Sequence, residues 1–142
     1  MTSIDFYFNA GDRLQVACRL AGKAVSQGKR TLVYAPDAEL AQRIDRLMWT
    51  WPATGFVPHT SPSDPLAAET PVLIAEEPGP ECDILINLST ECPPLFERYA
   101  RVLEIVSTEE EDRSAGRARY AWYRERGYQL KAHDLAATGS AA

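Results

Sequence analysis

The chain has 142 residues, of which 45% are hydrophobic and 25% charged, and its formal net charge at pH 7 is −5. These values predict one globular domain, which we expect to cover residues 1–135, and residues 136–142 are expected to form a disordered tail. They argue against a protein that coats DNA, and the lack of an apolar run of about 18 residues or of a leader at Met1 predicts a soluble, cytoplasmic protein.

The first elements are expected to be a strand, a turn and a helix. Residues 4–8 form a β-rich run, and Asp12 can cap a helix whose apolar residues recur at three- and four-residue steps as far as Val25. Gly28 can end this helix in a left-handed conformation. The pattern then repeats with a strand over residues 31–35.

A second helix is expected after Asp37, which can cap it. It carries an inward apolar stripe and brings Trp49 to its end. The stripe consists of Leu40, Ile44, Leu47 and Met48. Residues 52–80 are rich in proline and contain one short apolar run, residues 72–75, which we expect to be a third or edge strand.

Residues 83–88 have the unbroken apolar character of a strand that is covered on both faces. A short helix through Phe96 and Tyr99 leads to a fifth strand over residues 102–106. Four acids at residues 109–112 then precede a basic, aromatic helix from about Arg113 to Arg126. The alternation predicts a three-layer α/β sandwich with a mostly parallel central sheet of about five strands.

Catalytic, cofactor and metal sites have no good candidate. The first turn, residues 9–12, contains only Gly11 and therefore fails the GxGxxG test of a dinucleotide site. The histidines, His59 and His133, lie in no spaced ligand motif, and no nucleophile elbow occurs. Three cysteines without CxxC spacing predict reduced thiols. A small α/β enzyme or a binding protein for a nucleotide or phosphorylated ligand stays open as the alternative function.

The first candidate binding surface is apolar. Large side chains follow the second helix, and they form either a small satellite core under a loop or a hydrophobic protein interface. The residues concerned are Met48, Trp49, Trp51, Phe56, Val57 and Pro58.

The second candidate surface is basic. Residues 113–131 contain six bases and one acid, a net charge of +5, which leaves −10 for the rest of the chain. Within this segment Arg113, Arg117, Tyr120 and Arg124 follow at spacings of four, three and four, which places them on one helix face. Cations around an aromatic ring suit a peptide carboxylate, although a solvated helix face, or a helix that binds single strands directly, would have the same composition.

The chain resembles the chi subunit of bacterial DNA polymerase III over nearly its whole length. The resemblance is carried by Leu-Met-Trp-Thr-Trp-Pro at residues 47–52, Gly-Phe-Val-Pro-His at 55–59, the strand at 83–88 and Arg-Ala-Arg-Tyr at 117–120. The Phe-Val-Pro-His stretch is its most specific part.

The resemblance implies a Rossmann-like, non-catalytic accessory protein of the clamp loader that has no nucleotide site. Trp49, Phe56 and their neighbours would bind the psi subunit, giving a heterodimer. Val106, Arg113, Arg117 and Tyr120 would bind the acidic, phenylalanine-terminated tail of single-stranded DNA-binding protein, so that contact with DNA is indirect. Ala121 stands where other members carry a lysine, and Arg124 could supply that charge from the next turn.

Overall fold

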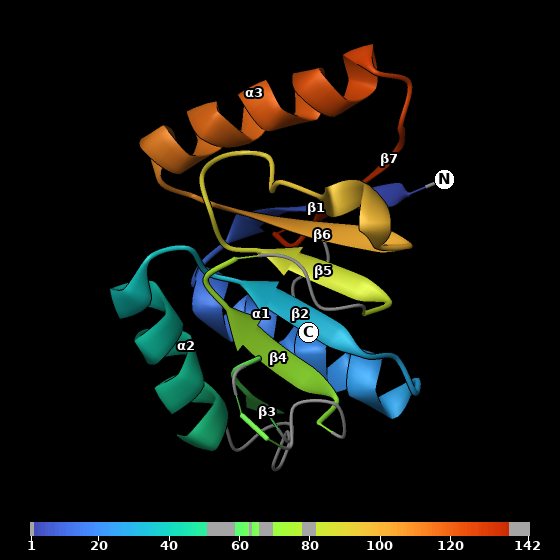
Figure 1. Ribbon diagram of the computed structural model, residues 1–142. Helices are drawn as coiled ribbons and strands as arrows, with labels where there is room; N and C mark the ends of the chain where they lie inside the picture. Colours follow the sequence, from blue (N-terminus) through green and yellow to red (C-terminus); the bar gives the residue numbers. More distant parts are fainter. Residues whose placement is uncertain (1, 51–58, 63, 66–69, 78–81, 137–142) are drawn as a thin grey trace.

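Parallel strands form one sheet, whose order among the described residues is β3-β4-β2-β5-β6-β1-β7 (Figure 1). The computed structural model describes residues 2–50, 59–62, 64–65, 70–77 and 82–136. Every pairing between neighbouring strands is parallel. The strands are β1 (Ser3–Ala10), β2 (Thr31–Tyr34), β3 (His59–Thr60), β4 (Val72–Ala75), β5 (Ile84–Asn87), β6 (Arg101–Ser107) and β7 (Gln129–Asp134).

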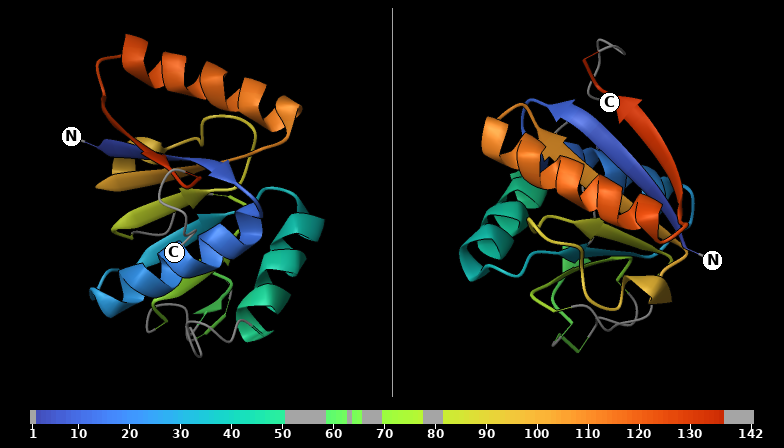
Figure 2. Two further views of the ribbon diagram at one scale, coloured as in Figure 1. Left: turned by 180° about the vertical axis from the view of Figure 1, so that it is seen from behind. Right: turned by 90° about the horizontal axis from the view of Figure 1, so that it is seen from above.

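Helices cover both faces of this sheet. The helices are α1 (Arg13–Ser26), α2 (Ala38–Thr50), the short 3-10 helix η2 (Phe96–Arg98) and α3 (Glu110–Glu125). Figure 2 shows α1 and α2 on one face and α3 on the other. The expected α/β sandwich with a parallel sheet is therefore confirmed.

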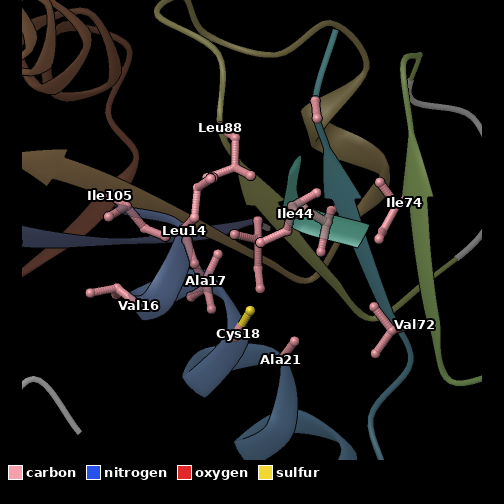
Figure 3. Close-up of a cluster of buried hydrophobic side chains, with 14 of the residues drawn as sticks. Leu14, Val16, Ala17, Cys18, Ala21, Ile44, Val72, Ile74, Leu88 and Ile105 are labelled. Atoms are coloured by element: carbon pink, nitrogen blue, oxygen red, sulfur yellow. The ribbon is translucent and has the colours of Figure 1, made fainter. Parts of the chain in front are cut away.

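Alternate residues of each central strand supply the two cores. On β2, Val33 belongs to the core under α1 and α2, whereas Leu32 and Tyr34 belong to the core on the α3 face. Figure 3 shows the first core, in which Leu14 and Ala17 of α1 lie against the sheet. Because both faces are buried, the central strands read as continuous apolar runs.

The sheet contains two described strands more than the five expected. β3 has two residues, too few to produce a pattern in the sequence. β7 lies at the edge of the sheet and is mostly exposed, so it lacks the apolar run by which the central strands were recognised. Neither strand alters the fold class.

The predicted helix signals are confirmed, with one shift of a boundary. The Asp12 carboxylate accepts hydrogen bonds from the backbone N–H groups of Leu14 and Gln15, at 3.0 and 3.3 Å. Gly28 and Gly127 have positive φ angles of 73° and 81°, which glycine adopts without strain. α3 starts at Glu110, not at about Arg113, because the acids that were expected ahead of the helix form its first turn.

Within the described residues, no helix combines the length and the apolar character that crossing a membrane requires.

The three cysteines are free thiols, as expected. The predicted tail lies outside the described residues except for Ala136, so the division of the chain at this point stays a prediction.

Candidate functional site

One exposed indole represents the apolar candidate surface among the described residues. Trp49, near the end of α2, is 59% exposed, the largest exposure of any large hydrophobic residue that the structure describes. Met48 was expected beside it but is 1% exposed and belongs to the core, because it continues the inward stripe of α2. Trp51, Phe56, Val57 and Pro58 lie outside the described residues.

His59 supports this indole from the neighbouring strand. Its ring lies 4.9 Å from the Trp49 ring, centroid to centroid, at an interplanar angle of 61°. The His59 side chain is fully buried, and its Nε2 lies 3.2 Å from Oδ1 of Asp45, one helical turn before Trp49. This arrangement could not be predicted from the sequence, because a single histidine outside any motif has no visible partner there.

The basic candidate surface lies on α3, which carries the four residues that were expected to share one helix face. Arg113, Arg117 and Arg124 are exposed, and Tyr120 is half-buried between them along the helix. The Arg117 guanidinium forms an ion pair of 3.3 Å with Glu110, which lies two turns earlier on the same helix. The Arg124 guanidinium carbon lies 5.9 Å from the centre of the Tyr120 ring, within the range of a cation–π contact.

Tyr120 is held by aromatic residues of β1. Its ring lies 5.2 Å from that of Phe6 and 6.2 Å from that of Phe8. Val106 was expected to line a pocket beside Tyr120, but it is 1% exposed and belongs to the core on this face of the sheet. Val106 therefore lies beneath α3 and supports the surface without contributing to it.

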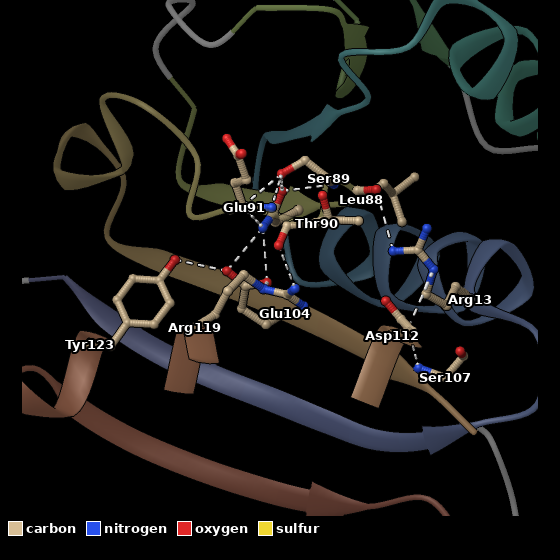
Figure 4. Close-up of polar contacts among 11 residues, drawn as sticks. Arg13, Leu88, Ser89, Thr90, Glu91, Glu104, Ser107, Asp112, Arg119 and Tyr123 are labelled. Carbon is tan, nitrogen blue, oxygen red and sulfur yellow. Dashed lines mark hydrogen bonds and ion pairs between the residues drawn. The ribbon is translucent and has the colours of Figure 1, made fainter. Parts of the chain in front are cut away.

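Arg119 differs from the other bases of α3, because it points into the protein. It is 3% exposed, and its Nε donates a hydrogen bond of 2.9 Å to Oε1 of Glu104, a fully buried residue of β6 (Figure 4). Tyr123 donates a 2.8 Å bond to the other oxygen of the same carboxylate. One of the six bases of this segment is thus structural, and the exposed patch is less basic than the sequence suggested.

The same network fixes the loop after β5. Asn87 donates to both oxygens of Glu104 and to the carbonyl of Glu91, and Arg119 Nη1 donates to the carbonyl of Thr90 at 3.0 Å. Burial raises the pKa of the Glu104 carboxyl, and Arg119 is the strongest of the groups that oppose this rise. Glu104 was not among the predicted functional residues, although a lone acid inside an apolar strand indicates a buried partner.

A hollow of about 660 Å³ lies at the carboxyl ends of β2 and β5, where open α/β sheets often bind ligands. Tyr34 lies in its wall, and its rim carries three acids, Asp37, Glu39 and Glu91, together with Arg13 and Arg43. Three carboxylates against two guanidinium groups do not favour a phosphate. The first turn, which fails the glycine test, contributes no residue to this hollow.

No group of three or more potential metal ligands occurs within the part of the chain that the structure describes. The Asp83 carboxylate has a structural role, since its Oδ2 accepts a hydrogen bond of 2.9 Å from the backbone N–H of Arg30. Among the described side chains, two features are thus candidates for binding proteins: the exposed indole of Trp49 near the end of α2 and the cationic face of α3.

Comparison with known proteins agrees with this description. The sequence model of the family described as "DNA polymerase III chi subunit, HolC" matches residues 1–131. A protein of Pseudomonas aeruginosa named DNA polymerase III subunit chi is 37% identical over 139 residues, which cover 95% of this chain and 98% of that protein. The Escherichia coli protein of the same name is 32% identical over 119 residues, which cover 82% of this chain and 81% of that protein. The chain therefore belongs to the family of DNA polymerase III chi subunits.

Proposed function

We propose that this protein is a non-catalytic accessory subunit of DNA polymerase III, and that it links two protein partners during replication. The apolar surface around Trp49 binds the psi subunit of the clamp loader. The cationic face of α3 binds the acidic C-terminal tail of single-stranded DNA-binding protein. The protein then acts by tethering, which raises the local concentration of the polymerase at coated single strands.

The observation that carries the tail-binding proposal is the arrangement on α3. A half-buried tyrosine held by Phe6 and Phe8 lies among three exposed arginines. A guanidinium can bind both oxygens of a terminal carboxylate, and a fixed aromatic ring offers a contact to an apolar last side chain. With Arg119 buried, Arg113, Arg117 and Arg124 are the cations of this face that are left for the ligand.

Trp49 supports the psi-binding proposal. An indole that is 59% exposed at the end of a helix is costly to leave in water, and tryptophan is among the residues that contribute most to protein interfaces. The two surfaces belong to helices on opposite faces of the sheet, so both partners can be bound at once (Figure 2).

The tail-binding proposal is tested by calorimetry with an acidic peptide that ends in phenylalanine. The same peptide is titrated as the free acid and as the C-terminal amide. The free acid should bind, and the amide should bind at least tenfold more weakly because it lacks the charged carboxylate that the arginines recognise. Equal affinities would show that the terminal carboxylate is not recognised.

The psi-binding proposal is tested by titrating the psi subunit into the wild-type protein and into Trp49→Ala. Loss of a central aromatic anchor should weaken binding by about 2 kcal/mol or more. The exposed α2 residue Gln42 provides a control, since Gln42→Ala changes the same helix without touching the indole.

A further inference from the structure

The exposed indole of Trp49 packs against the buried imidazole of His59. Trp49 lies one residue before the end of α2, and its neighbour Met48, on the inner side of the helix, is buried. The imidazole of His59 approaches the indole from β3 with its ring tilted by 61°. One side of the indole is thus in contact with the protein, while more than half of the residue remains exposed.

The imidazole is itself held in place. β3 pairs with β4 through His59 and Val72, which fixes the backbone of His59. The Asp45 carboxylate lies 3.2 Å from Nε2, and the His59 side chain has no exposed surface. Because Asp45 and Trp49 are four residues apart on α2, both face the same imidazole. The three side chains form one unit that joins α2 to the edge of the sheet.

We infer that His59 is a positioning residue, which holds the Trp49 indole in the orientation that the psi subunit binds, with Asp45 fixing the imidazole. This inference rests on the proposed psi-binding function of the Trp49 surface. A tryptophan at a helix end otherwise has several rotamers, and ordering it on binding reduces affinity. Orienting the indole before the partner arrives removes that cost.

The test measures the affinity of the intact protein for the psi subunit by calorimetry. His59→Ala should raise the dissociation constant about 3- to 10-fold, which is the range expected for immobilising one large side chain. His59→Phe keeps a ring against the indole and should recover most of the affinity. Asp45→Ala, at a half-exposed position, should give a smaller loss, and Gln42→Ala should bind like the wild type.

A double-mutant cycle separates positioning from general support of the fold. If His59 acts through the indole, His59→Ala costs no further affinity once Trp49 is alanine. Additive losses would overturn the inference. The indole N–H signal of Trp49 gives a second measurement, because it should shift in His59→Ala while the signal of Trp122 on α3 stays in place.

The outcomes distinguish the inference from the proposed function. Wild-type affinity of Trp49→Ala would contradict the psi-binding proposal itself. Weak binding by Trp49→Ala together with wild-type binding by both His59→Ala and Asp45→Ala would leave psi binding intact and overturn the positioning role. If His59→Ala fails to fold, Asp45→Ala and His59→Phe still test the inference. A loss of affinity in Asp45→Ala together with near-wild-type affinity of His59→Phe would support it. Wild-type affinity of Asp45→Ala, or affinity of His59→Phe as weak as that of Trp49→Ala, would overturn it.

Discussion

Gly116 of α3 lies directly against Val106 of β6: a Cβ atom placed on Gly116 would come within 2.6 Å of Cγ2 of Val106. Real Cβ atoms do not approach other heavy atoms this closely, so the absence of a side chain allows α3 to lie at its present distance from the sheet. The height of the cationic surface above β6 is therefore set by a glycine and a buried valine.

We predict that Gly116→Ala lowers the free energy of unfolding by about 1 to 3 kcal/mol, because overpacking outweighs the roughly 1 kcal/mol that alanine gains in a helix. Urea denaturation measures this. Gly11→Ala is the control, since a Cβ there has no heavy atom within 4 Å. Combining Gly116→Ala with Val106→Ala should cost less than the two separate changes together. A stability of Gly116→Ala at or above that of the wild type would contradict the close contact.

We predict that Arg117→Ala weakens binding of the free-acid peptide by on the order of 1 to 3 kcal/mol, as expected for loss of a charged clamp. Arg126→Ala is the matched control, because its guanidinium stacks on Trp122 at 3.8 Å, away from Tyr120. The two variants change the net charge equally. Equal effects of both variants in the same titration would mean that α3 attracts the peptide only through its total charge.

The ion pair between Glu110 and Arg117 leads to the opposite prediction for Glu110. The Glu110 carboxylate pairs with the Arg117 guanidinium and so competes with the ligand carboxylate for it. The negative charge of Glu110 also repels an acidic peptide. Glu110→Gln should therefore strengthen peptide binding, by about 0.5 kcal/mol because the site is exposed and screened. Calorimetry at low and high salt measures this, with Glu111→Gln as the control. Weaker binding by Glu110→Gln would mean that Glu110 holds Arg117 in its binding orientation.

The buried network gives a prediction for stability. Glu104→Ala removes the only acid that contacts the Arg119 side chain within the described residues, and it should cost about 3 to 5 kcal/mol by leaving a buried charge without its partner. Thermal and urea unfolding measure the loss. Replacing both residues by apolar ones, Glu104→Leu with Arg119→Met, should recover much of it. A double variant as unstable as the sum of its single variants would show that the network, and not the unpaired charge, matters.

The cysteines should differ in reactivity. Burial, with a smaller effect of Asp12, raises the pKa of Cys18 to about 12, so only about one thiol in 10⁴ is ionised at pH 8. Burial also raises the pKa of Cys82 and of Cys92, but both are only half-buried. In mass spectrometry after treatment with a thiol reagent, Cys82 and Cys92 should be modified in the folded protein and Cys18 only after unfolding. Early modification of Cys18 would contradict its burial.

The strands and helices that carry apolar patterns were predictable from the sequence, because burial on one or both faces leaves a period in the residues. Asp12 and Gly28 were recognised for a different reason: each has a local conformational role, one as a helix cap and the other at a positive φ angle. β3 and β7 were not, since a two-residue strand and an exposed edge strand have no such pattern.

The candidate site was predicted in part. The spacing in the sequence grouped Arg113, Arg117, Tyr120 and Arg124 on one helix, and all four lie on α3. It could not separate Arg119, whose burial depends on Glu104, a partner distant in the sequence. The position of Val106 and the role of His59 likewise depend on contacts between elements, which a single sequence does not reveal.

β5 pairs with β2 on one side and with β6 on the other, through four residues in each case. These short pairings have a mechanical consequence. α2 follows β2, and α3 follows β6, while β5 lies between these two strands. A pull between partners on α2 and α3 would therefore pass across β5 through two short ladders in series. Asn87, at the end of β5, is bonded to Glu104 of β6 and would reinforce the second ladder against such tension. Under the proposed function, β5 would therefore carry the mechanical load between the two bound proteins.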